Sequence, residues 1–265
     1  MIAPHPDPAG AGPLVGIVPA AGRAVRLGSP TGSKELLPVW RPSSSRAGAP
    51  LPAIGCHLSS FERAGVDRAF VVFRTGKEDI PSALGTETDG GMRLDYIEVE
   101  STPSPPFTLA AAVPQLSGAT VVMGFPDILF EPLEAVRRIL TPLRQRQADI
   151  VLGLFPHPLV RRADVLDLEA NGLVREVHSS CDPTADAWTW GLAAWSPRFT
   201  RFLHDCLAGF DAAEQRAGCL GVSDVLNAAI KQGLVVRGEV ASDTPFLDIG
   251  TPDALEEAYR RLDDL

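Results

Sequence analysis

The polar and apolar positions follow two periods in the first part of the chain. Short apolar runs, several of them rich in β-branched residues, alternate with stretches in which apolar residues recur at helical spacing. The runs predict strands at residues 14–21, 68–73, 94–100, 119–125 and 148–155. The stretches between them predict helices at 54–64, 108–116 and 132–147. This alternation predicts an α/β fold with a doubly wound, mostly parallel, Rossmann-like sheet.

The pattern changes after residue 163. Two short alternating runs flank Asn171-Gly172, a dipeptide typical of a hairpin turn. A strand at 188–196 and a helix at 197–210 follow, and the last helix begins at Pro252, with Thr251 as its N-cap. We therefore expect one domain, residues 14–265, with a small antiparallel subregion. The proline-rich residues 1–13 are expected to form a disordered tail.

Charge and composition narrow the class of protein. The chain has 33 acidic and 24 basic residues and a net charge of −9, so it lacks the basic face of a nonspecific nucleic-acid binder. It contains no apolar run long enough for a membrane span, and its first residues show no secretory signal. The four cysteines lack the spacing of a zinc site or of a disulfide framework. We expect a cytoplasmic protein with no nucleic-acid or membrane partner.

A loop of small residues with three cations follows the first predicted strand. The backbone of Ala20–Gly22 allows a ligand to approach closely, and successive N–H groups at a strand end accept an anion. Arg23, Arg26 and Lys34 come next and can contact a triphosphate. The alternative is an ordinary surface turn with solvated bases. The segment is neither GxGxxG nor GxxxxGK[ST], which argues against a dinucleotide site and a P-loop.

Two aspartates are candidate metal ligands. Asp127 follows the predicted strand 119–125, and Asp248 lies between the apolar residues Leu247 and Ile249. Two carboxylates, together with phosphate oxygens, form a site that Mg²⁺ favours. An aspartate after a strand is also a common turn former. The prediction therefore requires that the two residues meet in space.

Three segments, in order, resemble the sugar-1-phosphate nucleotidylyltransferases, a family that includes the glucose-1-phosphate thymidylyltransferases. PAAGRAVRLGSPTGSKELLPV (19–39) resembles the N-terminal signature of the family, GFPDILFE (124–131) its metal-binding segment and FLDIGTPDAL (246–255) its C-terminal D-x-G-T-P segment. The likeness extends over about residues 14–260. It implies a GT-A-like nucleotidyltransferase fold. It also implies transfer of a nucleoside monophosphate from a nucleoside triphosphate to a sugar 1-phosphate, with release of pyrophosphate.

The resemblance and the residue patterns together assign expected roles to residues in four groups. The catalytic cations are Arg26 and Lys34, and the ligands of Mg²⁺ are Asp127 and Asp248. The nucleotide-binding residues are Ala20, Ala21, Gly22, Arg23, Thr102 and Thr108. The sugar-binding residues are Gly153, Ser179, Ser180, Trp188 and Trp190.

One departure from the family keeps alternatives open. Where the family has Glu-Lys-Pro, with the lysine on the sugar phosphate, this chain has VREVHSSCDP. The hydroxyl groups of Ser179 and Ser180 cannot replace an ammonium, because charge-assisted hydrogen bonds are much stronger. Either Arg175 or His178 substitutes, or the acceptor is a non-sugar phosphate or phosphonate, or the chain is a weakly catalytic regulatory subunit. The base, the sugar and homo-oligomer formation also stay open.

The tryptophans and histidines have plainer explanations. Trp188, Trp190 and Trp195 alternate as strand residues do, so core packing is the first interpretation and stacking on a sugar the second. The histidines show no catalytic pairing with serine or cysteine, and His57 and His204 are expected on helix surfaces.

Overall fold

The structure is a computed structural model of the chain. It describes residues 12–23, 27, 32–41, 49–145, 147–157, 163–181, 187–210 and 220–263. The expected tail lies outside these ranges except for Gly12 and Pro13, and the candidate catalytic residue Arg26 also lies outside them. No helix in the described part of the chain is long and apolar enough to cross a membrane.

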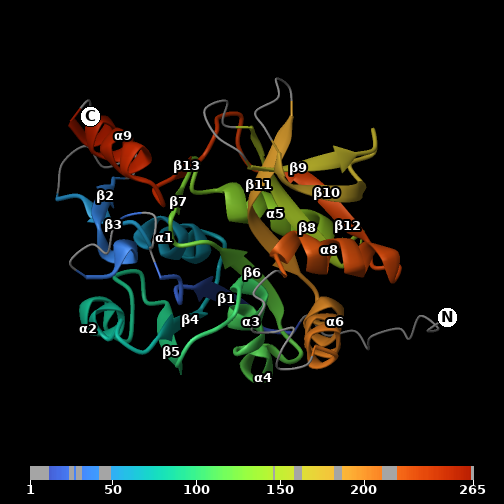
Figure 1. The fold of residues 1–265 in the computed structure, drawn as a ribbon, viewed down its shortest axis with the longest axis horizontal. Helices are drawn as coiled ribbons and strands as arrows, with labels where there is room; N and C mark the ends of the chain where they lie inside the picture. The colour runs from blue at the N-terminus through green and yellow to red at the C-terminus, as the bar shows by residue number, and fades with distance from the viewer. Residues whose placement is uncertain are drawn as a thin grey trace.

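A seven-stranded sheet forms the centre of the molecule, in the order β12-β8-β11-β6-β1-β4-β5 (Figure 1). Every strand is parallel to the others except β11, which runs antiparallel to its neighbours β6 and β8. The predicted mostly parallel sheet is therefore confirmed. Its strands are β1 (Leu14–Pro19), β4 (Arg68–Arg74), β5 (Arg93–Val99), β6 (Thr120–Gly124), β8 (Ile150–Pro156), β11 (Trp188–Trp195) and β12 (Val236–Val240).

Apolar side chains cover both faces of this sheet. Along β1, Val18 belongs to one buried cluster and Ile17 to the other, since successive side chains point to opposite faces. The first cluster includes side chains of α1 (Gly55–Arg63), α2 (Asp79–Leu84), α5 (Ala135–Arg144) and α9 (Pro252–Asp263). The second includes side chains of α3 (Pro105–Ala110), α4 (Val113–Leu116), α6 (Pro197–Ala208) and α8 (Val222–Lys231).

Within the described residues, three small antiparallel pairs accompany the central sheet. The predicted hairpin is formed by β9 (Ala163–Leu168) and β10 (Val174–Cys181), and Gly172 in its turn has a φ of 83°. The other pairs are β2 (Pro38–Trp40) with β3 (Leu51–Pro52) and β7 (Ile128–Leu129) with β13 (Leu247–Asp248). The 3₁₀ turn η2 (Lys34–Leu36) precedes β2.

Two predicted helices differ from those in the structure, and the structure contains further elements that were not predicted. The predicted helix 108–116 is two short helices, α3 and α4, because Pro114 lacks the N–H that would continue the hydrogen-bond ladder. The helix predicted over 132–147 spans only Ala135–Arg144. Helices α2 and α8 and the edge strand β12 were not predicted. The sequence of β12, VRGEV, carries two charges and a glycine, so its strand pattern is weak.

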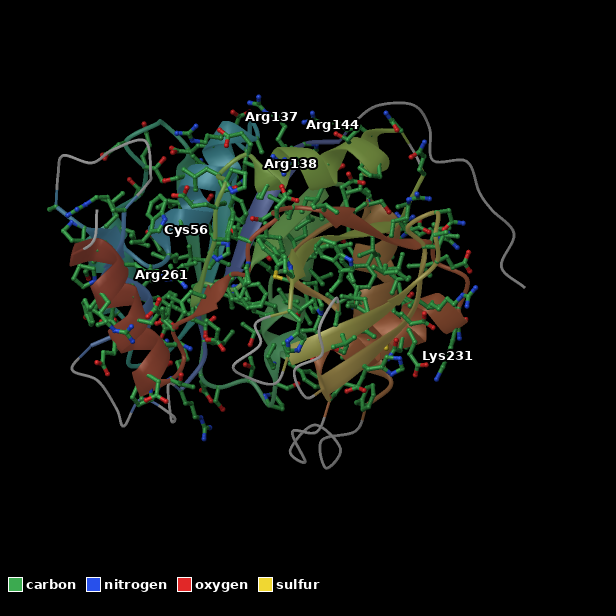
Figure 2. All side chains as sticks on the ribbon, turned by 90° about the horizontal axis from the view of Figure 1, so that it is seen from above. Cys56, Arg137, Arg138, Arg144, Lys231 and Arg261 are labelled. Carbon is green, nitrogen blue, oxygen red and sulfur yellow. The ribbon has the colours of Figure 1, made fainter. Side chains whose placement is uncertain are left out.

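Helix α5 is amphipathic, with one face of buried apolar side chains. Val136, Ile139 and Leu140 are buried against the sheet. Arg137, Arg138 and Arg144 gather on one side of the molecule, whereas Cys56 of α1 lies inside it (Figure 2). Two of these arginines hold backbone groups of neighbouring elements, since Arg137 donates to the carbonyl of Arg63 and Arg138 to that of Ala241. Arg137 thus links α5 to the end of α1, and Arg138 links it to the segment after β12.

Candidate active site

A cleft of about 780 Å³ opens at the carboxyl ends of strands β1, β4, β5 and β6. In doubly wound sheets this edge is where ligands bind, because the loops after neighbouring strands meet there. The cleft is lined by residues 21–23 after β1, Arg74 at the end of β4, residues 101–105 after β5 and residues 125–127 after β6. Lys34, Glu35 and Thr108 complete its wall.

The two candidate metal ligands lie in adjacent backbone segments. Strand β13 pairs with β7 so that Asp248 is opposite Ile128, the residue next to Asp127. The N–H of Ile249 donates to the carbonyl oxygen of Asp127 at 2.9 Å. Oδ1 of Asp248 accepts a hydrogen bond from the N–H of Gly250 at 2.7 Å, which orients its carboxylate. Tertiary pairing has therefore brought together two acids that are far apart in the chain.

Lys34 completes this charged group. Its Nζ lies 2.5 Å from Oδ2 of Asp127, and both side chains are mostly buried. Burial by itself lowers the pKa of Lys34, but the negative charges of Asp127, Glu35 and Asp248 together outweigh it and raise the pKa above the ordinary value. The ammonium is therefore charged at neutral pH and faces the cleft.

The donor atoms present here fit a magnesium ion. The described residues contain no cluster of three or more His, Cys, Asp or Glu side chains that could enclose a metal. Mg²⁺ does not need such a cage, since it commonly takes one or two carboxylates and completes its shell with phosphate oxygens and water. Asp127, which lines the cleft directly before β7, and Asp248 of the paired strand β13 offer carboxylate oxygens of the kind that Mg²⁺ prefers. The role of these residues as metal ligands stays a prediction.

The expected nucleotide-binding residues surround one end of the cleft. Ala21, Gly22, Arg23, Thr102 and Thr108 line it, and Ala20 is buried directly before them. The hydroxyl groups of Thr102 and Thr108 lie 2.6 Å apart and share a hydrogen bond. A pair of hydroxyl groups at this wall can donate to or accept from a ligand edge.

The expected sugar-binding residues are more dispersed. Gly153 is buried in β8, where an added Cβ would lie 3.0 Å from Cβ of Leu192, so close packing accounts for this glycine. Ser179 is exposed on β10, and the side chain of Ser180 lies outside the described residues. Trp188 is half-buried at the start of β11. Neither Gly153 nor Ser179, Trp188 or Trp190 is among the described residues that line the cleft.

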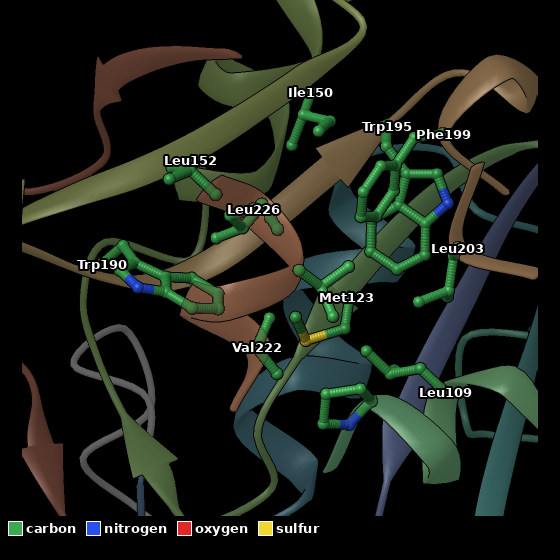
Figure 3. A pocket seen from close by; sticks show the side chains of 13 residues that line it. Leu109, Met123, Ile150, Leu152, Trp190, Trp195, Phe199, Leu203, Val222 and Leu226 are labelled. Carbon is green, nitrogen blue, oxygen red and sulfur yellow. The ribbon is translucent and has the colours of Figure 1, made fainter. Parts of the chain in front are cut away.

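Trp190 stands behind the cleft. A register shift between Trp190 and Leu192 in β11 places Trp190, Ala193 and Trp195 in the same buried cluster. The ring of Trp190 contacts that of Phe125, which does line the cleft, and its Nε1 donates to Asp164 at 3.3 Å. Figure 3 shows Trp190 and Trp195 among the apolar side chains of a small pocket between β11 and the helices α6 and α8. Core packing is thus the main role that the structure shows for Trp190.

Three charged residues near the cleft were missed by sequence reasoning. Arg74 lines the cleft, and its Nε is buried without a hydrogen-bond partner among the described residues. Glu35 and Lys77 form a buried ion pair beside Lys34. The available signal was weak: Glu35 is one charge in SKELLP, and Arg74 and Lys77 are two of the charges in RTGKED, an ordinary pattern for a turn after a strand.

The prediction that His57 lies on a helix surface is wrong, whereas His204 is exposed as expected. His57 is fully buried, and its Nε2 lies 2.9 Å from the carbonyl oxygen of Ile128, to which it donates. Burial lowers its pKa to about 4. The close approach of the ring is possible because residue 124 is a glycine. A Cβ added at this position would overlap the imidazole. His57 therefore supports the segment that carries Asp127.

Comparison with known proteins identifies the fold. No family model matches the chain, and no curated protein matches it in sequence. Solved structures match it over nearly its whole length, and the chain has the fold of the sugar-1-phosphate nucleotidyltransferases. The matches include a Bacillus anthracis protein described as a glucose-1-phosphate thymidylyltransferase, with a TM-score of 0.79, 17% identity and coverage of 95% of this chain and 96% of that one.

Two further matches bind or use other compounds. The inositol-1-phosphate CTP transferase from T. maritima has a TM-score of 0.70 at 16% identity, with 96% of both chains covered. A UDP-glucose pyrophosphorylase complexed with UDP-glucose has a TM-score of 0.72 at 13% identity, with 95% of this chain and 98% of that one covered. At these identities the likeness establishes the fold, and the activity depends on the site itself.

Proposed function

We propose that the protein is a nucleotidyltransferase that joins a nucleoside triphosphate to a sugar 1-phosphate, with release of pyrophosphate and with Mg²⁺ as cofactor. One observation carries this proposal: Lys34 and Asp127 form an ion pair in the wall of the cleft, and the β7–β13 pairing brings Asp248 next to them, near enough for its charge to act on Lys34. An ammonium next to two carboxylates can contact a polyphosphate and a divalent cation at the same time. The fold shared with a thymidylyltransferase and a UDP-glucose pyrophosphorylase supports the same reaction class.

The residues of the chain act mainly by positioning and by charge. The triphosphate lies along residues 21–23, with the base toward Thr102 and Thr108, and Lys34 is directed at the phosphorus that is attacked. Negative charge develops on its oxygens as the acceptor phosphate approaches, and a fixed ammonium in a partly buried site stabilises it more than water does. Asp127 and Asp248 would hold Mg²⁺, which neutralises phosphate charge when bound. Asp127 also keeps the ammonium of Lys34 oriented.

The experiment that tests this function follows pyrophosphate. The purified chain is incubated with each common nucleoside triphosphate, a panel of sugar 1-phosphates and Mg²⁺. Release that requires both substrates and the metal is the expected result. No release with any pair, from protein with a cooperative unfolding transition, would refute the proposed activity.

A second candidate differs only in the acceptor. Strand β10 contains no lysine, and its Arg175 is paired with Glu169 at 3.0 Å on the protein surface. The fold is also that of an inositol-1-phosphate CTP transferase, whose named acceptor is a phosphorylated polyol. A non-sugar phosphate is therefore the alternative acceptor, and adding inositol 1-phosphate and a phosphonate to the panel separates the two. Nucleotide binding without pyrophosphate release on any acceptor would instead favour a regulatory subunit.

A further inference from the structure

A buried ion pair between Lys77 and Glu35 lies next to Lys34. Lys77 follows strand β4 through a turn in which Gly76 has a φ of 91°. Its Nζ donates to both carboxylate oxygens of Glu35, at 2.7 and 2.8 Å, and to the carbonyl oxygen of Ala20 at 2.9 Å. Lys77 is 4% exposed and Glu35 is 1% exposed. One ammonium therefore joins Glu35, the residue that follows Lys34, to the loop of residues 20–23 (the nucleotide loop).

A second contact from the same turn holds the residue that precedes Lys34. The carboxylate of Asp79 accepts a hydrogen bond from the N–H of Ser33 and another from its hydroxyl, each at 2.7 Å. Ser33 is itself buried. Ser33 and Glu35, the two sequence neighbours of Lys34, are thus both held by residues 77–79. These residues come from a different part of the chain.

Global stability is a poor explanation for the buried pair. Removing two charges from water costs free energy that their attraction often does not recover, so a well-packed apolar pair is frequently as stable or more stable. Burial raises the pKa of Glu35 and lowers that of Lys77, which is the direction expected for charges that have lost their hydration. What an ion pair provides and an apolar pair does not is orientation, here of three hydrogen bonds from one ammonium.

We infer that Lys77 and Asp79 are positioning residues, which act through Glu35 and Ser33 to fix the side chain of Lys34, and through Ala20 to fix the nucleotide loop. This inference rests on the proposed function. Neither Lys77 nor Asp79 is among the described residues that line the cleft. Their contacts therefore reach the reaction through the residues they hold, and a displacement of about 1 Å in such a group can lower a rate by about a hundredfold.

The first test uses the double variant Lys77→Met/Glu35→Leu, which replaces the ion pair with apolar side chains. Its Tm is expected to stay near that of the wild type. Its kcat is expected to fall at least about tenfold, and its KM for the triphosphate to rise, because Lys34 and Ala20 lose their support. A variant with both the kcat and the Tm of the wild type would overturn the inference, since a pair with a purely structural role predicts that result.

The second test uses Asp79→Ala, which removes a half-buried side chain and leaves the ion pair in place. Because the side chain of Asp79 holds Ser33, whereas Lys77 holds the nucleotide loop, kcat is expected to fall at least about tenfold while KM for the triphosphate changes little. Wild-type kcat in this variant would also overturn the inference. The matched control is Asp95→Asn, which removes the partner of Arg68 and Arg93 at the other end of β4 and β5 and should leave both constants unchanged.

A failure of the proposed function would be seen separately. If the wild-type protein releases no pyrophosphate, the proposed activity is refuted, and the support of the nucleotide loop is measured as calorimetric affinity for the triphosphate. The double variant is then expected to bind at least about fivefold more weakly than the wild type and the Asp95→Asn control. Equal affinity, or no binding by the wild type, would overturn the positioning role as well.

Discussion

The ammonium of Lys34 lies 2.5 Å from Oδ2 of Asp127, although 93 positions separate the two residues in the chain. Lys34 belongs to the short turn η2 after the nucleotide loop, and Asp127 follows the neighbouring strand β6. The contact gives the cleft a cation beside a carboxylate. An ammonium in this place can exchange part of its contact with Asp127 for a phosphate oxygen when a nucleotide binds.

Loss of the Lys34 charge should affect the chemical step more than binding. In Lys34→Gln, kcat is expected to fall about 10²–10³-fold, as it does when one preorganised donor to a developing charge is removed. Steady-state pyrophosphate release measures this, with circular dichroism to confirm the fold. Lys231→Gln, an exposed change at the end of α8, is the control and should behave as the wild type. A kcat within about threefold of wild type in Lys34→Gln would contradict the assigned role.

The two aspartates should both be required for metal-dependent turnover. In Asp127→Asn and in Asp248→Asn we expect turnover at least about a hundredfold lower and a higher Mg²⁺ concentration for half-maximal rate, because each change removes one anionic ligand. Titrating Mg²⁺ at a fixed nucleotide concentration measures both effects. The control is Asp253→Asn, which changes an aspartate in the first turn of α9, in the same FLDIGTPDAL segment as Asp248. An unchanged Mg²⁺ dependence in either variant would remove that residue from the metal site.

Arg74 should contribute to nucleotide affinity. Arg74 lines the cleft, as residues 101–105 do. Its Nη1 donates to the carbonyl oxygen of Thr75 at 3.0 Å, whereas its Nε is buried with no partner among the described residues. In Arg74→Met the KM for the triphosphate is expected to rise about tenfold with kcat nearly unchanged, because a hydrogen bond to a charged ligand contributes about 1.5–3 kcal/mol. The comparison is Arg68→Met, at the other end of the same strand. Equal KM values for the two variants would show that Arg74 does not contact the nucleotide.

His57 should make the stability of the fold depend on pH. Its pKa of about 4 in the folded state lies below the ordinary value of 6.5, so the unfolded chain binds more protons between these values. The contribution of the neutral ring is therefore present above pH 6.5 and is lost as the pH falls toward 4. Between about pH 7.5 and 5 the free energy of unfolding should fall by about 2 kcal/mol through this group.

The variant His57→Gln isolates that contribution. Its side-chain amide can still donate to the carbonyl of Ile128 but does not titrate. Urea denaturation at the two pH values measures the difference, and the variant should show a smaller loss than the wild type. Equal losses in both proteins would mean that His57 is not the titrating group.

Several features of the fold were accessible from local patterns. Apolar runs such as 68–73 and 119–125 predicted strands of the central sheet, and Asn171-Gly172 predicted the turn between β9 and β10. These succeeded because a strand or a turn depends on residues close together in sequence. His57 was misjudged because its position in an amphipathic helix does not say what lies opposite, and Gly124 leaves room for its ring.

The sequence by itself determined part of the chemistry available at the cleft. It placed a cation after the first strand and an aspartate after β6 and in β13, because residue type and proximity to a strand end are local properties. The tertiary structure alone decided that Asp127 and Asp248 share one strand pairing, that Lys77 reaches Glu35 and Ala20, and that Trp190 packs behind the cleft. These contacts depend on strand order, register and packing between distant segments, which no local periodicity specifies.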